Sequence, residues 1–182
     1  MVFEQLGSGD TLAGRGTTLA KSKAMSSLEL VYQYRLLLGK CSSGAGLTYD
    51  EIDELTALEA AFAASDDDQR AAEGRRFRRE RVDLSAVLRG GKLHDAVTVA
   101  ELAPGGLVCR SAPWAETGDA VEIVIEDESR SLSYRFKARV SWLREEHEGD
   151  DYVLGLEFVG IPVLVRYGTP MTHDPLLARI AA

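Results

Sequence analysis

Cysteine is scarce in this chain of 182 residues, and long hydrophobic runs are missing. The two cysteines, Cys41 and Cys109, lie in separate segments without the spacing of a metal site, which predicts free thiols in a reducing compartment. The first residues lack the basic region and the apolar stretch of a signal peptide, and no segment approaches the length of a membrane-spanning helix. We therefore expect a cytoplasmic protein that does not insert into a membrane.

Histidine is also rare, and His94, His147 and His173 are scattered along the chain. No serine or cysteine stands in a recognisable nucleophile setting, and no glycine-rich phosphate loop leads from a strand into a helix. The sequence therefore favours a binding or interaction protein over an enzyme, and it predicts neither a metal site nor a cofactor.

Positive charge is low overall but concentrated in one place. The formal net charge of -8 and the pI of about 5.0 argue against a protein that coats nucleic acids or membranes. Residues 75–81 nevertheless read RRFRRER, with Phe77 as the one aromatic among the arginines, a composition that does not favour specific nucleic-acid binding. This cluster predicts either a local anion site or a solvated segment that pairs with neighbouring acidic residues.

The N-terminal part contains a leader followed by helical segments. Residues 1–24 are rich in Gly, Ser, Thr and Ala without periodicity, which predicts a poorly ordered leader with Met25 as an alternative start. The next segment has apolar side chains at helical spacing, namely Leu28, Leu30, Val31, Tyr34, Leu37 and Leu38. The stretch GKCSSGAG then ends this helix.

A second helix begins after Thr48, because Thr48 and Glu51 have the spacing of a capping box. Acidic side chains occupy one face, and the opposite face carries Ile52, Leu55, Leu58 and Phe62. Residues 25–64 thus predict an α-helical hairpin with an apolar inner face. The sequence leaves open whether the following domain or a second copy of the chain, in a homodimer, covers that face.

After an acidic linker at residues 65–74 the pattern changes from helical to alternating. Turn residues, and no helical crossovers, separate six segments: VDLSAVL, VTVAEL, LVCRS, AVEIVIE, YRFKARVSWL and YVLGLEFV. This series predicts a mainly β domain at residues 75–163, with six antiparallel strands closed into a small barrel. Residues 164–182 are expected to form a tail with a short helix around Pro175 to Ile180, so the whole chain is α+β.

Alternation also assigns the side chains of the segment YRFKARVSWL. Trp142 shares its parity with Phe136 and Val140, which favours a core aromatic over a stacking platform. The opposite parity makes an outward positive stripe, read as a solvated face or a docking surface, from Arg135, Lys137 and Arg139.

Arg75 and Arg79 lie four residues apart just before the first strand. Guanidinium groups at this spacing suit a ligand that combines phosphate with a purine edge, because each planar fork can bind phosphate oxygens or the O6 and N7 acceptors of guanine. Together with the strands that follow, residues 75–160 resemble a PilZ domain. The resemblance implies a six-stranded barrel that binds the bacterial second messenger cyclic di-GMP, with Arg75 and Arg79 as its Arg-x-x-x-Arg motif.

The second motif of that family, Asp/Asn-x-Ser-x-x-Gly, aligns with residues 101–106. The resemblance therefore implies ligand-binding positions at Glu101, Ala103 and Gly106, with auxiliary basic residues at Arg76, Arg78, Arg81 and Arg110. Glu101 keeps a carboxylate that can accept from a guanine N–H, although its side chain is one methylene longer than that of aspartate. Ala103 lacks the hydroxyl, and a missing hydrogen bond of about 0.5 to 1.5 kcal/mol weakens binding several-fold.

Two functions are therefore open. The first is a cyclic di-GMP receptor that, as the resemblance implies, regulates motility, pili, surface attachment or exopolysaccharide through an unidentified bacterial protein partner. The second is a degenerate PilZ domain that binds no nucleotide and acts as a protein-interaction or dimerisation scaffold through its hairpin. Arg75 and Arg79 favour the first function, whereas Glu101 and Ala103 favour the second.

Overall fold

The computed structural model describes residues 13–63, 77–91, 93–146 and 151–167, with side chains from residue 23 onward. The predicted acidic linker, Arg75, Arg76 and the predicted helix in the tail lie outside the described residues. The helices and strands are α1 (Ala13–Ser42), α2 (Tyr49–Phe62), β1 (Glu80–Gly90), β2 (Leu93–Ala103), β3 (Gly106–Ala112), β4 (Ala120–Asp127), β5 (Leu132–Glu145), β6 (Tyr152–Phe158) and β7 (Val163–Arg166).

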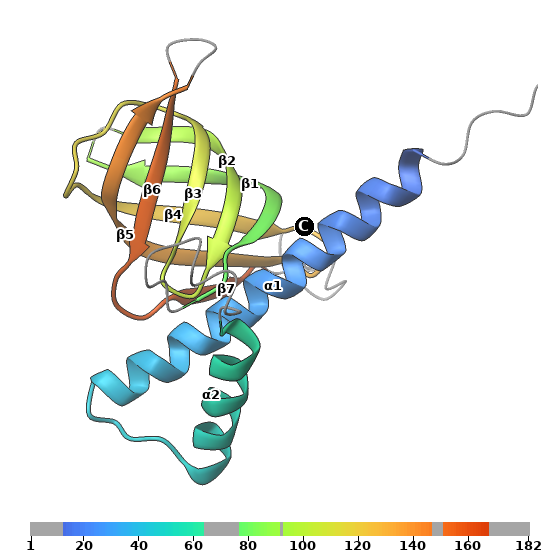
Figure 1. Cartoon of the computed structure of the whole chain (residues 1–182), viewed down its shortest axis with the longest axis vertical. Helices are drawn as coiled ribbons and strands as arrows, with labels where there is room; N and C mark the ends of the chain where they lie inside the picture. The colour runs from blue at the N-terminus through green and yellow to red at the C-terminus, as the bar shows by residue number, and fades with distance from the viewer. Residues whose placement is uncertain (1–12, 64–76, 92, 147–150, 168–182) are drawn as a thin grey trace, which may run out of the picture.

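Six of these strands close into an antiparallel barrel. They neighbour one another in the order β4-β1-β2-β3-β6-β5, and pairing of β4 with β5 closes the ring (Figure 1). Alternate side chains point inward and form one core cluster, whose fully buried members include Leu88, Ile123, Phe136 and Leu154. The predicted fold, a closed six-stranded antiparallel barrel preceded by helices, is confirmed.

The short strand β7 extends the sheet beyond the six predicted strands. The 14-residue strand β5 makes this possible, because its first half pairs with β4 on one side and with β7 on the other, while its second half pairs with β6. Residues 164–166, which the sequence pattern assigns to the tail, therefore belong to the sheet. The four residues of β7 are mostly exposed and too few to produce an alternating signal of their own.

The helix α1 runs across one end of the barrel (Figure 1). It begins at Ala13, so it includes residues 13–24 that were expected to form the leader. The barrel core also contains side chains from this helix, namely Ala24, Met25, Leu28 and Val31. The barrel of the same chain thus covers the apolar face of α1 for which the sequence left two partners open.

The prediction is wrong for one residue of the apolar stripe on α1. Leu30 is 44% exposed, whereas Leu28 and Val31 are fully buried. Leu30 follows Leu28 by two positions, and residues two apart lie on nearly opposite sides of a helix, so the side chain of Leu30 points away from the barrel.

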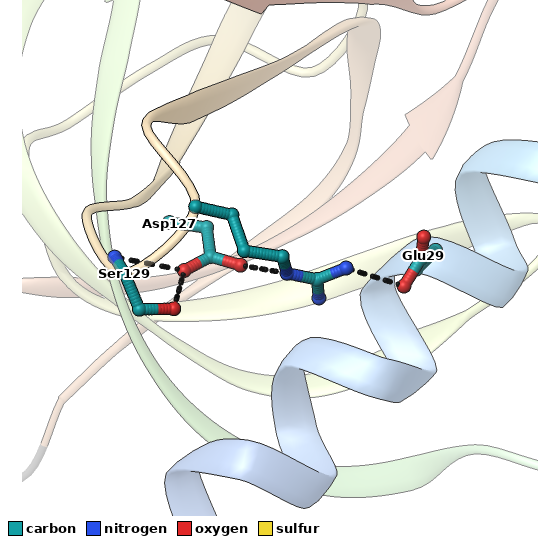
Figure 2. A network of polar contacts seen from close by, with 4 residues as sticks. Glu29, Asp127 and Ser129 are labelled. Carbon is teal, nitrogen blue, oxygen red and sulfur yellow. Dashed lines mark hydrogen bonds and ion pairs between the residues drawn. The ribbon is translucent and has the colours of Figure 1, made fainter. Parts of the chain in front are cut away.

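A polar network fastens α1 to the turn between β4 and β5 (Figure 2). Arg130 contacts Asp127 through Nε and Glu29 of α1 through Nη1, each at 2.7 Å. Asp127 also accepts hydrogen bonds from the backbone N–H and the hydroxyl of Ser129. Burial of Asp127 raises its pKa, but the hydrogen bonds from Ser129 and Arg130 outweigh burial, so its pKa lies below the ordinary value.

Two further polar contacts join α1 to the barrel. The hydroxyl of Ser27 donates to Glu80, the first residue of β1, at 2.6 Å. Arg35 donates through Nη2 to the carbonyl oxygens of Phe158 and Gly160, at 3.2 and 2.9 Å. Burial of the guanidinium lowers the pKa of Arg35. These contacts fix the start of β1 and the end of β6 relative to the same helix.

The helix α2 packs against the C-terminal half of α1 and forms the predicted hairpin. Its capping box is confirmed, because Thr48 Oγ1 accepts from the N–H of Glu51 and Glu51 accepts from the N–H of Thr48. A small core separate from the barrel contains Tyr34, Leu37 and Leu58. Ile52, predicted on the inner face, is instead exposed near the start of α2. No helix in the described part of the chain combines the length and apolar character needed to cross a membrane.

Candidate functional site

Four adjacent strands, β2, β3, β6 and β5, form one side of the barrel (Figure 1). Direct cross-strand pairing connects a first row of residues: Glu101, Val108, Gly155 and Trp142. A second row is connected in the same way: Ala103, Gly106, Glu157 and Arg139. The row between them belongs to the barrel core: Leu102, Leu107, Leu156 and Val140. Because successive strand residues point to opposite faces, the first and second rows face outward.

A cavity of about 340 Å³ lies over these outward rows. Four small residues are among those that line it: Ala103, Gly105, Gly106 and Gly155. Its sides carry the indole of Trp142 and the carboxylate of Glu157, and the segment before β1 adds Phe77 and Arg79. The cavity therefore has an apolar floor and charged groups at its edges. This combination suits a flat ring that bears polar groups.

Two β-bulges adjoin this cavity and change which side chains face it. The register shifts on β2 between Val99 and Glu101, and on β5 between Val140 and Trp142. A bulge inserts an extra residue, so the side chains beyond it exchange faces of the sheet. Both shifts come immediately before a residue that lines the cavity, Glu101 on β2 and Trp142 on β5.

The bulge on β5 overturns the expectation that Trp142 is a core aromatic. With Ser141 inserted, Trp142 lies opposite Gly155 and lines the cavity, while Leu143 packs against the barrel core in its place. A Cβ added to Gly155 would lie 2.1 Å from the indole of Trp142, which means that the ring rests directly on the glycine. A glycine inside a strand often marks such a close approach, and this signal in YVLGLEFV was available in the sequence.

Arg79 and Glu101, one from each predicted motif, form an ion pair at the edge of the cavity. Nη1 of Arg79 lies 3.2 Å from Oε2 of Glu101, and the two side chains are 37% and 36% exposed. Arg79 precedes β1, whose residue Arg81 is the cross-strand partner of Glu101. The pairing of β1 with β2 therefore places the two motifs beside each other.

Phe77 connects the cavity to the helical hairpin. Its ring lies edge-on to the ring of Tyr34 with centroids 5.5 Å apart, and it also packs against the small hairpin core. The backbone continues this connection, because Phe77 forms an isolated bridge with Ala63 and Arg78 donates its N–H to the carbonyl of Phe62 at 3.0 Å. Phe77 was not predicted as a site residue, since a single aromatic residue among the arginines of residues 75–81 gives no sequence signal of its own.

Four predicted ligand positions therefore come together around one cavity: Arg79, Glu101, Ala103 and Gly106. Gly106 also has a purely structural reason to be glycine, because an added Cβ would lie 2.0 Å from the carbonyl oxygen of Leu156. Of the auxiliary residues in the described chain, Arg78 and Arg81 are exposed beside Arg79 without lining the cavity. Arg110 lines a different cavity, with Arg144 and Glu146 among its neighbours.

The charges around the cavity are mixed. Among the described residues that line it, Arg79 is the one cation, whereas Glu101 and Glu157 are anions. Glu157 lies opposite Arg139 in the pairing of β5 with β6, and its charge also acts on Arg35 of α1. An anionic ligand would thus meet one guanidinium that already has a carboxylate partner.

Comparison with protein families assigns the barrel. The family model of the PilZ domain matches residues 73–166, from the arginine cluster to the end of β7. The chain belongs to the PilZ domain family. The predicted resemblance is therefore confirmed, and the match includes the arginine segment and all seven strands but neither helix of the hairpin.

Comparison with solved structures finds the Bacillus subtilis inhibitor of motility, MotI/DgrA. The two chains share 14% sequence identity over 48% of this PilZ protein and 43% of the other chain, with a TM-score of 0.40. The alignment thus spans less than half of that chain. A search of curated proteins found no match.

Proposed function

We propose that this PilZ protein is a cytoplasmic receptor for cyclic di-GMP that acts on a bacterial protein partner. One observation carries the proposal: strand pairing places Arg79 from the first family motif and Glu101, Ala103 and Gly106 from the second around a single cavity. Arg79 and Glu101 bring a cation and a hydrogen-bond acceptor to the same opening, and a guanine nucleotide needs both. PilZ is a family of ligand-binding effector domains rather than enzymes, and the proposed role is accordingly binding and not catalysis.

The described side chains suit the parts of a guanine nucleotide. The guanidinium of Arg79 binds a phosphate oxygen or the O6 and N7 acceptors of guanine, and the carboxylate of Glu101 accepts from a guanine N–H. Trp142 lines the side of the cavity and can stack on a base in place of the guanidinium of Arg144, which lies over its ring 5.9 Å from the centroid. Ala103, Gly106 and Gly155 leave the space that a planar base needs. The proposal assigns Arg75 as the second guanidinium.

Calorimetric titration with cyclic di-GMP tests the receptor function. Native protein is expected to bind at micromolar concentration, and Arg79→Ala to bind at least tenfold more weakly, since a hydrogen bond to a charged group contributes about 1.5 to 3 kcal/mol. Arg110→Ala is the matched control, because Arg110 is exposed and lines another cavity. Equal affinities of native protein and Arg79→Ala, with the fold intact by circular dichroism, would contradict the site assignment.

A second candidate function rests on the charges of the same cavity. Glu101 already forms an ion pair with Arg79 at 3.2 Å, and Glu157 adds a second carboxylate to the cavity. These features favour a PilZ domain that binds no nucleotide and acts on its partner as a scaffold. Under this second proposal the native chain gives no heat of binding with cyclic di-GMP, and Glu101→Asp combined with Ala103→Ser restores binding by rebuilding the motif of the family.

A further inference from the structure

The ion pair between Arg79 and Glu101 joins the two groups that a phosphate-bearing ligand would have to separate. Their contact distance is 3.2 Å, and both side chains are partly solvated at the edge of the cavity. An ion pair with this exposure contributes little to folding, because solvent screens it and both long side chains lose rotamer freedom. The pair affects an incoming anion in two ways, because Glu101 competes with the anion for the same guanidinium and its carboxylate also repels the anion.

The backbone holds the two partners in place independently of the ion pair. Glu80, the neighbour of Arg79, accepts from Ser27 at 2.6 Å and pairs with Lys23 at 3.3 Å, so α1 anchors the start of β1. Glu101 follows a bulge in β2 and is paired with Arg81 of β1. Removal of the charge on Glu101 should therefore leave Arg79 at the cavity and change mainly its availability.

We infer that Glu101 is an internal competitor, which occupies Arg79 while the cavity is empty and is displaced by the phosphate of the ligand. This inference rests on the proposed receptor function and adds to it a residue that sets the affinity. The glutamate has the length to reach Arg79 from β2, whereas an aspartate at this position is one methylene shorter. Glu101 therefore raises the ligand concentration at which the site fills.

The test compares the affinity of cyclic di-GMP for native protein and for Glu101→Gln, which keeps the size of the side chain, removes its charge and retains an oxygen that accepts from a guanine N–H. Glu101→Gln is expected to bind about threefold to tenfold more tightly, the range expected when one partly exposed ion pair and its repulsion of phosphate are lost. Glu126→Gln removes the same charge from the exposed face of β4, outside the cavity, and should bind within about twofold of native protein.

A second variant separates displacement of a specific contact from a general charge effect. Glu157 lines the same cavity from β6, and Glu157→Gln removes an equal charge there. The inference requires that Glu101→Gln tightens binding more than Glu157→Gln does. An equal increase in affinity in the two variants would mean that only the net charge of the cavity matters, and it would overturn the role of the ion pair.

The remaining outcomes keep the two proposals apart. Unchanged or weaker binding by Glu101→Gln, when native protein binds, overturns the inference and leaves the receptor function standing. If neither native protein nor Glu101→Gln binds cyclic di-GMP, the receptor function fails, and the inference fails with it. Binding by Glu101→Gln alone would contradict both the receptor function and the inference, because the ligand would then not displace Glu101 in the native chain.

Discussion

The indole of Trp142 rests on Gly155, its directly paired neighbour across strands β5 and β6. The contact depends on the absence of a side chain at residue 155, since an added Cβ would lie 2.1 Å from the ring. It also depends on the bulge at Ser141, which turns Trp142 out of the core. One glycine and one inserted residue thus create the aromatic wall of the cavity.

Gly155→Ala should displace the indole of Trp142 and destabilise the barrel by about 1 to 3 kcal/mol, the usual cost of forcing extra atoms into a packed site. Urea unfolding measures the loss, and the emission wavelength of Trp142, recorded with Trp114 replaced by phenylalanine, reports the move of its ring. Gly105→Ala is the control, because an added Cβ at that turn meets no atom within 4 Å. A Gly155→Ala variant as stable as the control would mean that the ring does not rest on the glycine.

Phe77→Ala should loosen the attachment of the hairpin to the segment that carries Arg79. A fully buried phenylalanine costs about 3 to 5 kcal/mol when truncated, and we expect about 2 kcal/mol for the half-buried Phe77. Hydrogen exchange should become faster in α2 while the barrel strands keep their protection. Tyr49→Ala removes an aromatic ring that is 89% exposed and should leave exchange in α2 unchanged. Equal exchange in Phe77→Ala and native protein would contradict the coupling.

Asp127 should make the stability of the protein depend on pH in acid. Its pKa is lowered in the folded chain, so the carboxylate stabilises the fold above its unfolded pKa of about 3.9, and this stability is lost as the pH falls through the lower folded value. Urea midpoints at pH 7 and pH 3 should therefore differ less for Asp127→Asn than for native protein. An identical pH dependence of the two proteins would show that the network of Figure 2 does not stabilise the charged form.

The two cysteines should differ in reactivity. Cys109 is fully buried in the barrel core, and desolvation raises the pKa of its thiol to about 12, so almost no reactive thiolate is present at neutral pH. Cys41 is exposed near the end of α1. Alkylation of native protein at pH 7.5, followed by mass spectrometry, should label Cys41 first, and Cys109 only after unfolding. Labelling of both thiols at similar rates would contradict the burial of Cys109.

Most of the barrel could be predicted from the sequence, because long parts of strands such as β1 and β5 alternate between core and solvent. The capping residues Thr48 and Glu51 located α2 in the same way, from a local hydrogen-bonding pattern. The strand β7 and the burial of Ala24 in α1 could not be predicted, since the pairing of β7 with β5 and the packing of Ala24 against the barrel depend on distant parts of the chain.

The candidate site could be predicted only at positions that align with the family motifs. Arg79, Glu101, Ala103 and Gly106 were named from the sequence and lie around one cavity. Trp142 was assigned to the core because alternation counts residues, and a bulge of one residue reverses the count. The ion pair between Arg79 and Glu101 was equally hidden, since it depends on the register between β1 and β2.

An NMR titration of ¹⁵N-labelled protein with cyclic di-GMP tests the central claim most directly, because it both detects binding and locates it. The account predicts shifts of the indole N–H of Trp142 and of the backbone amides of Ala103, Gly106 and Gly155. The indole N–H of Trp114, on the loop between β3 and β4 and outside the cavity, should stay unchanged. Unmoved signals for the cavity residues at millimolar ligand would contradict a nucleotide site between the two motifs.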